Sequence, residues 1–576
     1  MTAPPPVLDK PWRRSGAIRY LASRLRGILR PPVTVTPAAD HIAVDRDVCV
    51  PMRDGTILRA NVFRQDPDND RRPVIVSIHP YGKDNLPKRR GRRWSYSFQY
   101  RILRQPDPVQ FSELTGWEAP DPAWWVAQGF VVINADLRGC GHSDGTAQLL
   151  SHQEGRDSAD LVEWAAAQPW SDGRVVMLGV SYLAISQYGA AAERPAALRA
   201  IVPWEGFTDP YRDFAAPGGV PERGFLRVWG TMLRRTIRQA YDLTVMQRTH
   251  PLRDTFWASV TPDLTKIDVP MLVCGSFSDQ ALHSRGSMRA FTTVRSRHAR
   301  LYTHRGGKWS VFYSSEARAE QLAFIRGVLV DTATPVRSVR LEVREDRATI
   351  ASIREETEWP PAEARWRRLY LFDSGALADR APTEPGSITF GTRSHAAAFT
   401  WSIPEDVELT GPMSAQLWLE LHGCQDVNLF VGVEKWRHGR YVPFEGSFGY
   451  GRDRVATGWS RAALRHLDPV SSRPWEPVPT CADEQPLQPG EVVGINVALG
   501  PSSTLFRAGE QLRLVVAGRW LAPRNPLFGS FPSTYASSPR GRVTLHWGVD
   551  RAAHLLIPEL PVGPTNGNSG PSSAAG

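Results

Sequence analysis

Long hydrophobic runs are absent from the sequence. No stretch of about eighteen consecutive apolar residues, the length that a membrane-spanning helix needs, occurs anywhere in the chain. The region after Met1 also has no continuous apolar segment of the kind found in signal peptides. The sequence therefore predicts a cytoplasmic protein with no integral membrane segment.

Cysteine is scarce, and several cofactor signatures are missing. The 5 cysteines are widely spaced and form no CxxC pair, which excludes zinc-ribbon and thioredoxin motifs. Reduced thiols in the cytoplasm are the simplest account. No H-E-x-x-H, no P-loop and no G-x-G-x-x-G after a strand is present. We therefore expect no metal and no cofactor.

Nucleic-acid-binding modules are also missing, despite a formal net charge of +10. Arginine is scattered along the chain, so we expect no nucleic-acid partner. Part of the basic excess lies in an N-terminal arm, where residues 17–29 carry apolar residues at helical spacing and predict a basic amphipathic helix. An arm packed on the body or loosely ordered is the simpler interpretation, and binding to a membrane surface is the alternative.

Short apolar runs alternate with helical segments in the first part of the chain. The length of 576 residues, 41% of them hydrophobic, indicates two or three packed domains. Strands separated by helices are typical of a parallel, doubly wound α/β sheet. The apolar runs that predict buried strands are residues 74–78, 130–135, 175–180, 198–203, 269–274 and 300–303, and a helix capped by Asp157 or Ser158 is predicted over 159–167.

The periodicity changes twice further along the chain. A helical segment without strand-like runs interrupts the α/β pattern, and such insertions commonly cover an active site. Later, apolar residues recur at every second position, as at Leu417, Leu419 and Leu421, which predicts an antiparallel β-sandwich or jelly roll. The predicted organisation is a basic arm (1–40), an α/β domain (41–206 and 264–335), a helical cap (207–263), a β-sandwich (336–562) and a disordered tail (563–576).

A serine stands at the end of one predicted strand. The apolar run 175–180 leads into Ser181, after which a helix of small residues begins. Open α/β sheets bind ligands at the carboxyl ends of their strands. The nucleophile elbow G-x-S-x-G requires small residues on both sides of the serine. Gly179 supplies the first, whereas Leu183 stands in place of the second, so a serine that only forms a turn is the alternative.

A serine hydroxyl becomes an effective nucleophile when a base accepts its proton and an acid orients that base. In α/β-hydrolases these groups follow in the order Ser, Asp or Glu, His, each after a later strand. Asp279 follows the strand 269–274, and His304 follows the strand 300–303. Asp279 could instead be the N-cap of a helix over 281–291.

Three other histidines compete with His304 for the role of base. His283 lies only four residues after Asp279, so it is expected on the next helical turn rather than at a separate strand end. His298 precedes its strand and therefore belongs at the opposite edge of the sheet. His142 lies upstream of the serine, against the expected order, so we retain His304.

Six motifs, in one order along the chain, resemble those of the cocaine esterase and X-Pro dipeptidyl-peptidase family of α/β-hydrolases, the CocE/NonD-type serine hydrolases. That family has a G-x-S-Y-x-G elbow, in which the small residue comes one position later than usual. Here Ala184 takes that position. The matching segments are MRDGTIL (52–58), PYGK (80–83), DLRGCGHSDG (136–145), GVSYLA (179–184), ELTGP (408–412) and FRAGEQLRL (506–514).

The resemblance implies roles for particular residues. Ser181 corresponds to the nucleophile, Asp279 to the orienting acid and His304, less directly, to the base. The Tyr81 hydroxyl and the backbone N–H of Tyr182 correspond to the oxyanion hole, although the ring of Tyr81 could instead only cap the core. A phenol and an amide aimed at the developing alkoxide would stabilise it more than the ground-state carbonyl.

Two departures from the family pattern concern the acid and the base. Asp279 stands one residue later than in the family's G-W-x-D motif. The family's histidine often follows G-P-W by two positions, and aligning Gly307-Lys308-Trp309 with that motif leaves Val311 at the histidine's place. The choice of His304 therefore rests on chain order.

The sequence thus predicts a serine hydrolase of small ester or amide substrates, with specificity set by the cap, particularly Trp229 and Phe225 if they face the pocket. An X-Pro dipeptidyl-peptidase or a β-lactam-type acylase is the alternative, and for the peptidase Glu205 or Asp209 would hold the substrate's ammonium. A binding module for carbohydrate or protein that has lost catalysis is the third hypothesis. The sequence leaves the oligomeric state open, a homo-oligomer included.

Overall fold

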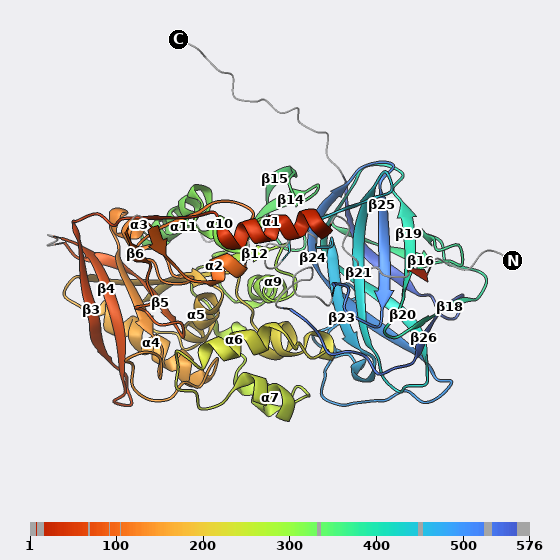
Figure 1. The fold of residues 1–576 in the computed structure, drawn as a ribbon, viewed down its shortest axis with the longest axis horizontal. Helices are drawn as coiled ribbons and strands as arrows, with labels where there is room; N and C mark the ends of the chain where they lie inside the picture. The colour runs from red at the N-terminus through yellow and green to blue at the C-terminus, as the bar shows by residue number, and fades with distance from the viewer. Residues whose placement is uncertain are drawn as a thin grey trace, which may run out of the picture.

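Two regions of different architecture make up the molecule. Figure 1 shows the helices and strands of the first part of the chain on one side and a group of strands from the last part on the other. None of the helices in the described part of the chain has both the length and the apolar character that a membrane crossing requires. The computed structural model describes residues 7–8, 17–66, 70–91, 93–103, 105–330, 336–446, 453–523 and 533–561.

The predicted parallel sheet is present, and its central strands are almost fully buried, which is why their sequences are continuously apolar. The strands that run parallel are, in spatial order, β9 (Val131–Asp136), β5 (Arg72–His79), β10 (Ser171–Val180), β11 (Leu198–Trp204), β12 (Met271–Ser276), β13 (Ala299–His304) and β14 (Ser338–Arg344). The antiparallel strands at the edges are β3 (Ile42–Pro51) and β4 (Ile57–Gln65) beside β9, and β15 (Ile350–Glu356) beside β14. Residues 338–344 therefore extend the central sheet. The sequence predicts them instead as part of the β-sandwich, 336–562.

Helices follow the strands. Those of the α/β part are α3 (Pro122–Ala127), α4 (His152–Ala166), α5 (Tyr182–Ala192), α9 (Ser284–Thr293), α10 (Lys308–Phe312) and α11 (Ser315–Leu329). Helix α4 begins earlier than predicted, because Ser151 rather than Asp157 or Ser158 is its N-cap and accepts a hydrogen bond from the Glu154 N–H at 3.4 Å. Asp157 and Ser158 are buried within the helix.

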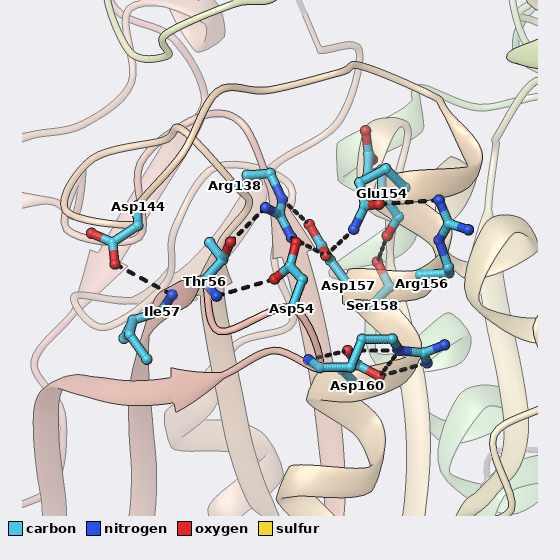
Figure 2. Close-up of polar contacts among 12 residues, drawn as sticks. Asp54, Thr56, Ile57, Arg138, Asp144, Glu154, Arg156, Asp157, Ser158 and Asp160 are labelled. Atoms are coloured by element: carbon cyan, nitrogen blue, oxygen red, sulfur yellow. Dashed lines mark hydrogen bonds and ion pairs between the residues drawn. The ribbon is translucent and has the colours of Figure 1, made fainter.

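Arg138 joins two of the segments that match the family motifs, 52–58 and 136–145, to helix α4 (Figure 2). Its guanidinium bonds to both carboxylate oxygens of Asp157 on α4 at 2.7 Å. It also donates to Thr56 Oγ1 at 2.6 Å and to Asp54 at 2.9 Å, in the β3–β4 turn. The loop after β9, the β3–β4 turn and α4 are thereby held together, so these motifs are structural rather than part of the site.

The segment 207–263, predicted to be helical, contains short helices and none of the named strands. They are a π-helix (Pro210–Ala215), a 3-10 helix (Pro217–Gly219), α6 (Phe225–Leu233), α7 (Leu243–Thr249) and α8 (Thr255–Ser259), and a further 3-10 helix (Leu264–Lys266) leads into β12. Trp229 and Leu226 of α6 are buried. This segment connects β11, which pairs with the serine's strand β10, to β12, the next strand of the sheet.

The last part of the chain consists mostly of antiparallel strands. Leu417, Leu419 and Leu421 all point into its core, as the alternation predicts. The longest strands are β20 (Val407–His422) and β24 (Val492–Phe506), which pair with each other. The others are β16 (Arg365–Leu371), β17 (Leu377–Ala378), β18 (Gly386–Gly391), β19 (Ala396–Ser402), β21 (Asn428–Arg437), β22 (Arg440–Val442), β23 (Ala456–Arg461), β25 (Gln511–Ala517), β26 (Arg542–Trp547) and β27 (His554–Leu560), with β1 (Val7–Leu8) paired to β19.

The N-terminal arm contains helix α1 (Ala17–Leu29), over the residues where the amphipathic pattern predicts one. The remaining short elements are two strand pairs, β2 (Val33–Thr36) with β8 (Val109–Ser112) and β6 (Lys88–Arg90) with β7 (Arg93–Ser95), and helix α2 (Gln99–Ile102). The predicted disordered tail, 563–576, lies outside the described residues.

Candidate active site

Ser181 occupies a sharp turn between β10 and α5. Its φ of 59° lies in the left-handed region, which is strained for a residue other than glycine and is typical of functional turns. A side chain on Gly179 would meet Leu183 Cβ at 2.4 Å, so the first glycine of the elbow is required. A Cβ on Gly206 would lie 2.9 Å from Ala184 Cβ. The small residue that packs closely after the serine is therefore Ala184, which stands one position later than the second glycine of the general G-x-S-x-G elbow.

A histidine and an aspartate align with this serine. Ser181 Oγ lies 3.2 Å from His283 Nε2, and His283 Nδ1 lies 2.5 Å from Asp279 Oδ2. The Asp279 carbonyl accepts a hydrogen bond from the His283 N–H at 3.1 Å, so the two residues are one helical turn apart. Side chains at this spacing share a side of the turn. With Nδ1–H donating to Asp279, the Nε2 lone pair faces the serine hydroxyl.

His304, the base expected from chain order, is not brought to Ser181. Its Nε2 lies 3.0 Å from Glu205 Oε1, and the other Glu205 oxygen accepts a hydrogen bond from Ser276 Oγ at 2.8 Å. The β12–β13 register sets His304 beside Ser276, one strand farther from the serine's strand. The turn after β12 instead directs His283 back towards Ser181. We therefore replace His304 by His283 in the candidate triad.

The other rejected or alternative residues lie in separate environments. His142 is exposed and bonds to Asp47, and His298 packs edge-on against Phe324. Asp209 caps the π-helix and pairs with Arg253 at 3.2 Å. Glu205 is bound to His304 and Ser276, as described above. Neither acid is among the residues that line the cavity beside Ser181.

Lys308 is a member of the site that sequence reasoning missed. Its buried ammonium lies 2.7 Å from Asp279 Oδ2 and 2.9 Å from His283 Nδ1. Burial acts to raise the pKa of Asp279, but Lys308 and His283 outweigh it and lower that pKa. Burial and the Lys308 ammonium hold the pKa of His283 below its ordinary value, against the attraction of Asp279. The site therefore favours a neutral imidazole beside an ionised carboxylate.

Beside Ser181 lies a mostly apolar cavity of about 570 Å³, partly open to solvent, whose lining includes five aromatic side chains. Phe225 and Trp229 of the cap segment line it, as the sequence allowed, together with Trp117, Trp309, Met232 and Leu103. Tyr81 also lines it, and the Tyr81 hydroxyl accepts a hydrogen bond from Trp229 Nε1 at 3.3 Å. Burial raises the pKa of Tyr81, so the phenol keeps its proton. The side chain of Tyr182 instead donates to Glu154 at 2.7 Å, so only its backbone can serve the serine.

Glu118 is the only carboxyl among the residues lining this cavity. It is buried, has a left-handed φ of 63°, and accepts a hydrogen bond from Trp309 Nε1 at 3.3 Å. Burial raises its pKa to about 8, a shift that the ammonium of Lys308 only partly opposes. At neutral pH this carboxyl is therefore mostly protonated and uncharged. Neither the left-handed backbone of Glu118 nor the burial of its carboxyl leaves a recognisable pattern in the sequence, so sequence analysis could not find this residue.

Two clusters among the described residues have the composition of metal sites, but their donors are already engaged. Glu205, Cys274 and His304 place their ligand atoms within 4.8 Å of one another. There the carboxylate and imidazole bond to each other, and burial raises the pKa of the thiol. In the second cluster, which is more exposed, the Lys83 ammonium already lies 2.9 Å from Asp47 and 2.5 Å from Asp84. Neither cluster fits a resident metal.

A strained serine between a strand and a helix of a parallel sheet, within reach of a histidine that an aspartate orients, is the arrangement of serine hydrolases with the α/β-hydrolase fold. Comparison with known proteins agrees. Residues 54–308 match the model of the X-Pro dipeptidyl-peptidase (S15 family), and residues 332–535 match that of the X-Pro dipeptidyl-peptidase C-terminal non-catalytic domain.

A CocE/NonD family hydrolase from Staphylococcus aureus is 31% identical, with a TM-score of 0.84 over 93% of this chain and 100% of that one. The chain belongs to this CocE/NonD family of hydrolases. The cocaine esterase of Rhodococcus sp. (strain MB1 Bresler) is 26% identical over 424 residues, which span 61% of this chain and 66% of that esterase. An α-amino acid ester hydrolase, 15% identical with a TM-score of 0.67 over 92% of this chain and 98% of its own, shares the fold.

Proposed function

We propose that this serine hydrolase cleaves small, uncharged ester or amide substrates through an acyl-enzyme intermediate, with Ser181 as nucleophile, His283 as base and Asp279 as orienting acid. The observation that carries the proposal is the continuous chain from Ser181 Oγ to His283 Nε2, 3.2 Å, and from His283 Nδ1 to Asp279 Oδ2, 2.5 Å. These contacts connect serine, histidine and aspartate in the order that proton transfer requires.

In the first step, His283 Nε2 accepts the Ser181 proton while Ser181 Oγ forms a bond to the substrate's carbonyl carbon. The negative charge that develops on the carbonyl oxygen is stabilised by the Tyr81 hydroxyl and the backbone N–H of Tyr182. His283 then returns the proton to the leaving oxygen or nitrogen, and the acyl–Ser181 ester remains. Water, deprotonated by the same imidazole, then attacks the acyl carbon, and His283 returns the proton to Ser181 Oγ as the acyl–Oγ bond breaks and the acid product leaves. No cofactor takes part.

The cavity supports a substrate with a bulky apolar or aromatic group. Its walls are mostly apolar and include five aromatic side chains, and such surfaces bind flat apolar groups by area burial and ring contacts. Its one lining carboxyl, Glu118, is mostly uncharged at neutral pH because burial raises its pKa to about 8. A free ammonium therefore finds no carboxylate pair among these lining residues. This favours an esterase or acylase over an X-Pro dipeptidyl-peptidase.

A fluorophosphonate probe tests the proposed nucleophile. Folded protein is expected to be labelled at one serine, and peptide mass analysis should place the adduct on Ser181. Ser181→Ala should abolish labelling, whereas Ser259→Ala, at an exposed serine of α8, should leave it unchanged. An adduct on another serine would contradict the triad. A folded protein that takes no label would instead favour a binding module without catalysis.

Lys308 offers a test of the electrostatics around the proposed base. The acid limb of the kcat/KM profile follows the pKa of the histidine, which must be neutral to accept the serine proton. Because the Lys308 ammonium lowers that pKa, Lys308→Met should raise it and move the acid limb to higher pH by about 1 unit or more. Steady-state pH profiles with a soluble p-nitrophenyl ester measure this shift.

The matched control for this experiment is Lys266→Met, which removes an exposed lysine that pairs with Asp263 and does not line the cavity. Its profile should coincide with that of the wild type. A Lys308→Met limb that stays in place, or moves to lower pH, would show that the lysine does not act on the proposed base.

A further inference from the structure

Helix α1 carries an apolar stripe that faces away from the protein. Ile18, Leu25 and Leu29 are 86%, 48% and 74% exposed. Their spacing of seven and four residues sets them on one side of the helix. Large apolar side chains that gather on one exposed helix side usually mark a contact surface, unlike isolated exposed ones.

The opposite side of α1 holds the helix to the body. Arg24 is buried, and Ile28 is half-buried. Arg101 of α2 donates to the Ile28 carbonyl at 3.1 Å, and α1 packs against α2. In Figure 1, α1 lies over the middle of the molecule with α2 next to it. The helix is therefore fixed with its apolar stripe outward.

The surroundings of the stripe are basic. Arg19, Arg26 and Arg30 are exposed, and the helix contains no acidic residue. Strand β6, whose three residues Lys88–Arg90 are all basic and exposed, precedes α2 in the chain. The connection from β7 to α2 is ordered by Arg101, which packs over the Tyr96 ring at 5.4 Å. Basic groups thus flank the stripe on α1, and further basic groups precede α2 in the chain.

We propose that this face, formed by the exposed side of α1, docks on an anionic lipid surface. Apolar side chains that enter the boundary between headgroups and acyl chains, beside arginines that contact the headgroups, are the pattern of helices that lie in a membrane interface. Charge complementarity selects the anionic membrane over an apolar protein partner.

Docking in this way would bring α2, which packs on α1 and lines part of the active-site cavity, close to the lipid. Gln99 and Leu103, in and just after α2, line the cavity that contains Ser181. Apolar esters partition into membranes, so docking would hold the enzyme at the phase that concentrates such substrates. This consequence rests on the proposed function, whereas the docking itself does not.

Co-sedimentation of the full chain, as Ser181→Ala, with vesicles tests docking without any use of activity. The protein should bind phosphatidylcholine vesicles that contain phosphatidylglycerol and bind pure phosphatidylcholine much less, and added salt should weaken binding. Replacing Ile18, Leu25 and Leu29 together by serine should reduce binding at least about tenfold. Arg19→Gln with Arg26→Gln should weaken binding to the anionic vesicles and remove part of its salt dependence.

Control substitutions distinguish this face from exposed residues elsewhere. Val470→Ser with Val549→Ser removes two exposed valines of the C-terminal part, and Arg551→Gln removes an exposed arginine there; both should bind like the parent. Circular dichroism and activity of the Ser181-containing versions on a soluble ester should be unchanged by the α1 substitutions. The proposal is overturned if anionic vesicles do not bind the protein, if the α1 variants bind undiminished, or if the stripe instead mediates a dimer that those variants dissociate.

Discussion

His283→Ala is expected to lower kcat on a soluble ester by as much as about 10⁶-fold, whereas His304→Gln should keep kcat within about tenfold of the wild type. The reason is geometric, because Ser181 Oγ lies 3.2 Å from His283 Nε2 and His304 is bound to Glu205. Without an imidazole at position 283 no group described beside the serine can accept its proton. Steady-state kinetics with a p-nitrophenyl ester, measured on both variants, decides between the two histidines.

The two variants should also differ in stability. His304→Gln disrupts a buried pair with Glu205 and should lower the free energy of unfolding by about 3 kcal/mol, so its kinetics are measured below its unfolding transition. Denaturant unfolding of both proteins supplies that comparison. If His304→Gln lost activity while folded and His283→Ala retained it, chain order would be the better guide and the proposed triad would be wrong.

The parallel sheet could be predicted because its strands are buried on both faces and are therefore apolar throughout. β12, for example, has six buried residues, and five of them are Met, Leu, Val, Cys or Gly. The serine could be found for the same reason, since an elbow follows a strand that is easily recognised. The start of α4 was missed because polar groups such as Asp157 are buried there against Arg138, and only the folded chain supplies that partner.

The histidine was missed for a local reason. Chain order assigns each triad member to its own strand end, but in the candidate triad Asp279 and His283 belong to a single helical turn. Two features of the sequence could have pointed to His283. It stands four residues after Asp279, and Val311 occupies the position where the family often has its histidine. Lys308 and Glu118 gave no such signal, because their positions depend on the packing of segments far apart in the chain.

Ser181→Ala is expected to lower kcat by about 10⁶-fold, and adding His283→Ala to it should lower kcat no further. The two side chains act as one unit in the proposed mechanism: without the hydroxyl there is no proton for the imidazole to accept, and without the imidazole the hydroxyl stays protonated. Kinetics of the two single variants and the double variant, on the same soluble ester, measure this coupling.

Residual activity in the double variant distinguishes the triad from the rest of the site. Substrate binding and the oxyanion donors, proposed to be the Tyr81 hydroxyl and the Tyr182 N–H, should still accelerate hydrolysis by about 10³-fold over water. Adding Tyr81→Phe to the double variant should therefore remove most of what remains, because Tyr81 acts on the substrate's oxygen rather than on the serine. Losses that instead multiply between Ser181→Ala and His283→Ala would mean that the two residues act independently, which a proton transfer between them does not allow.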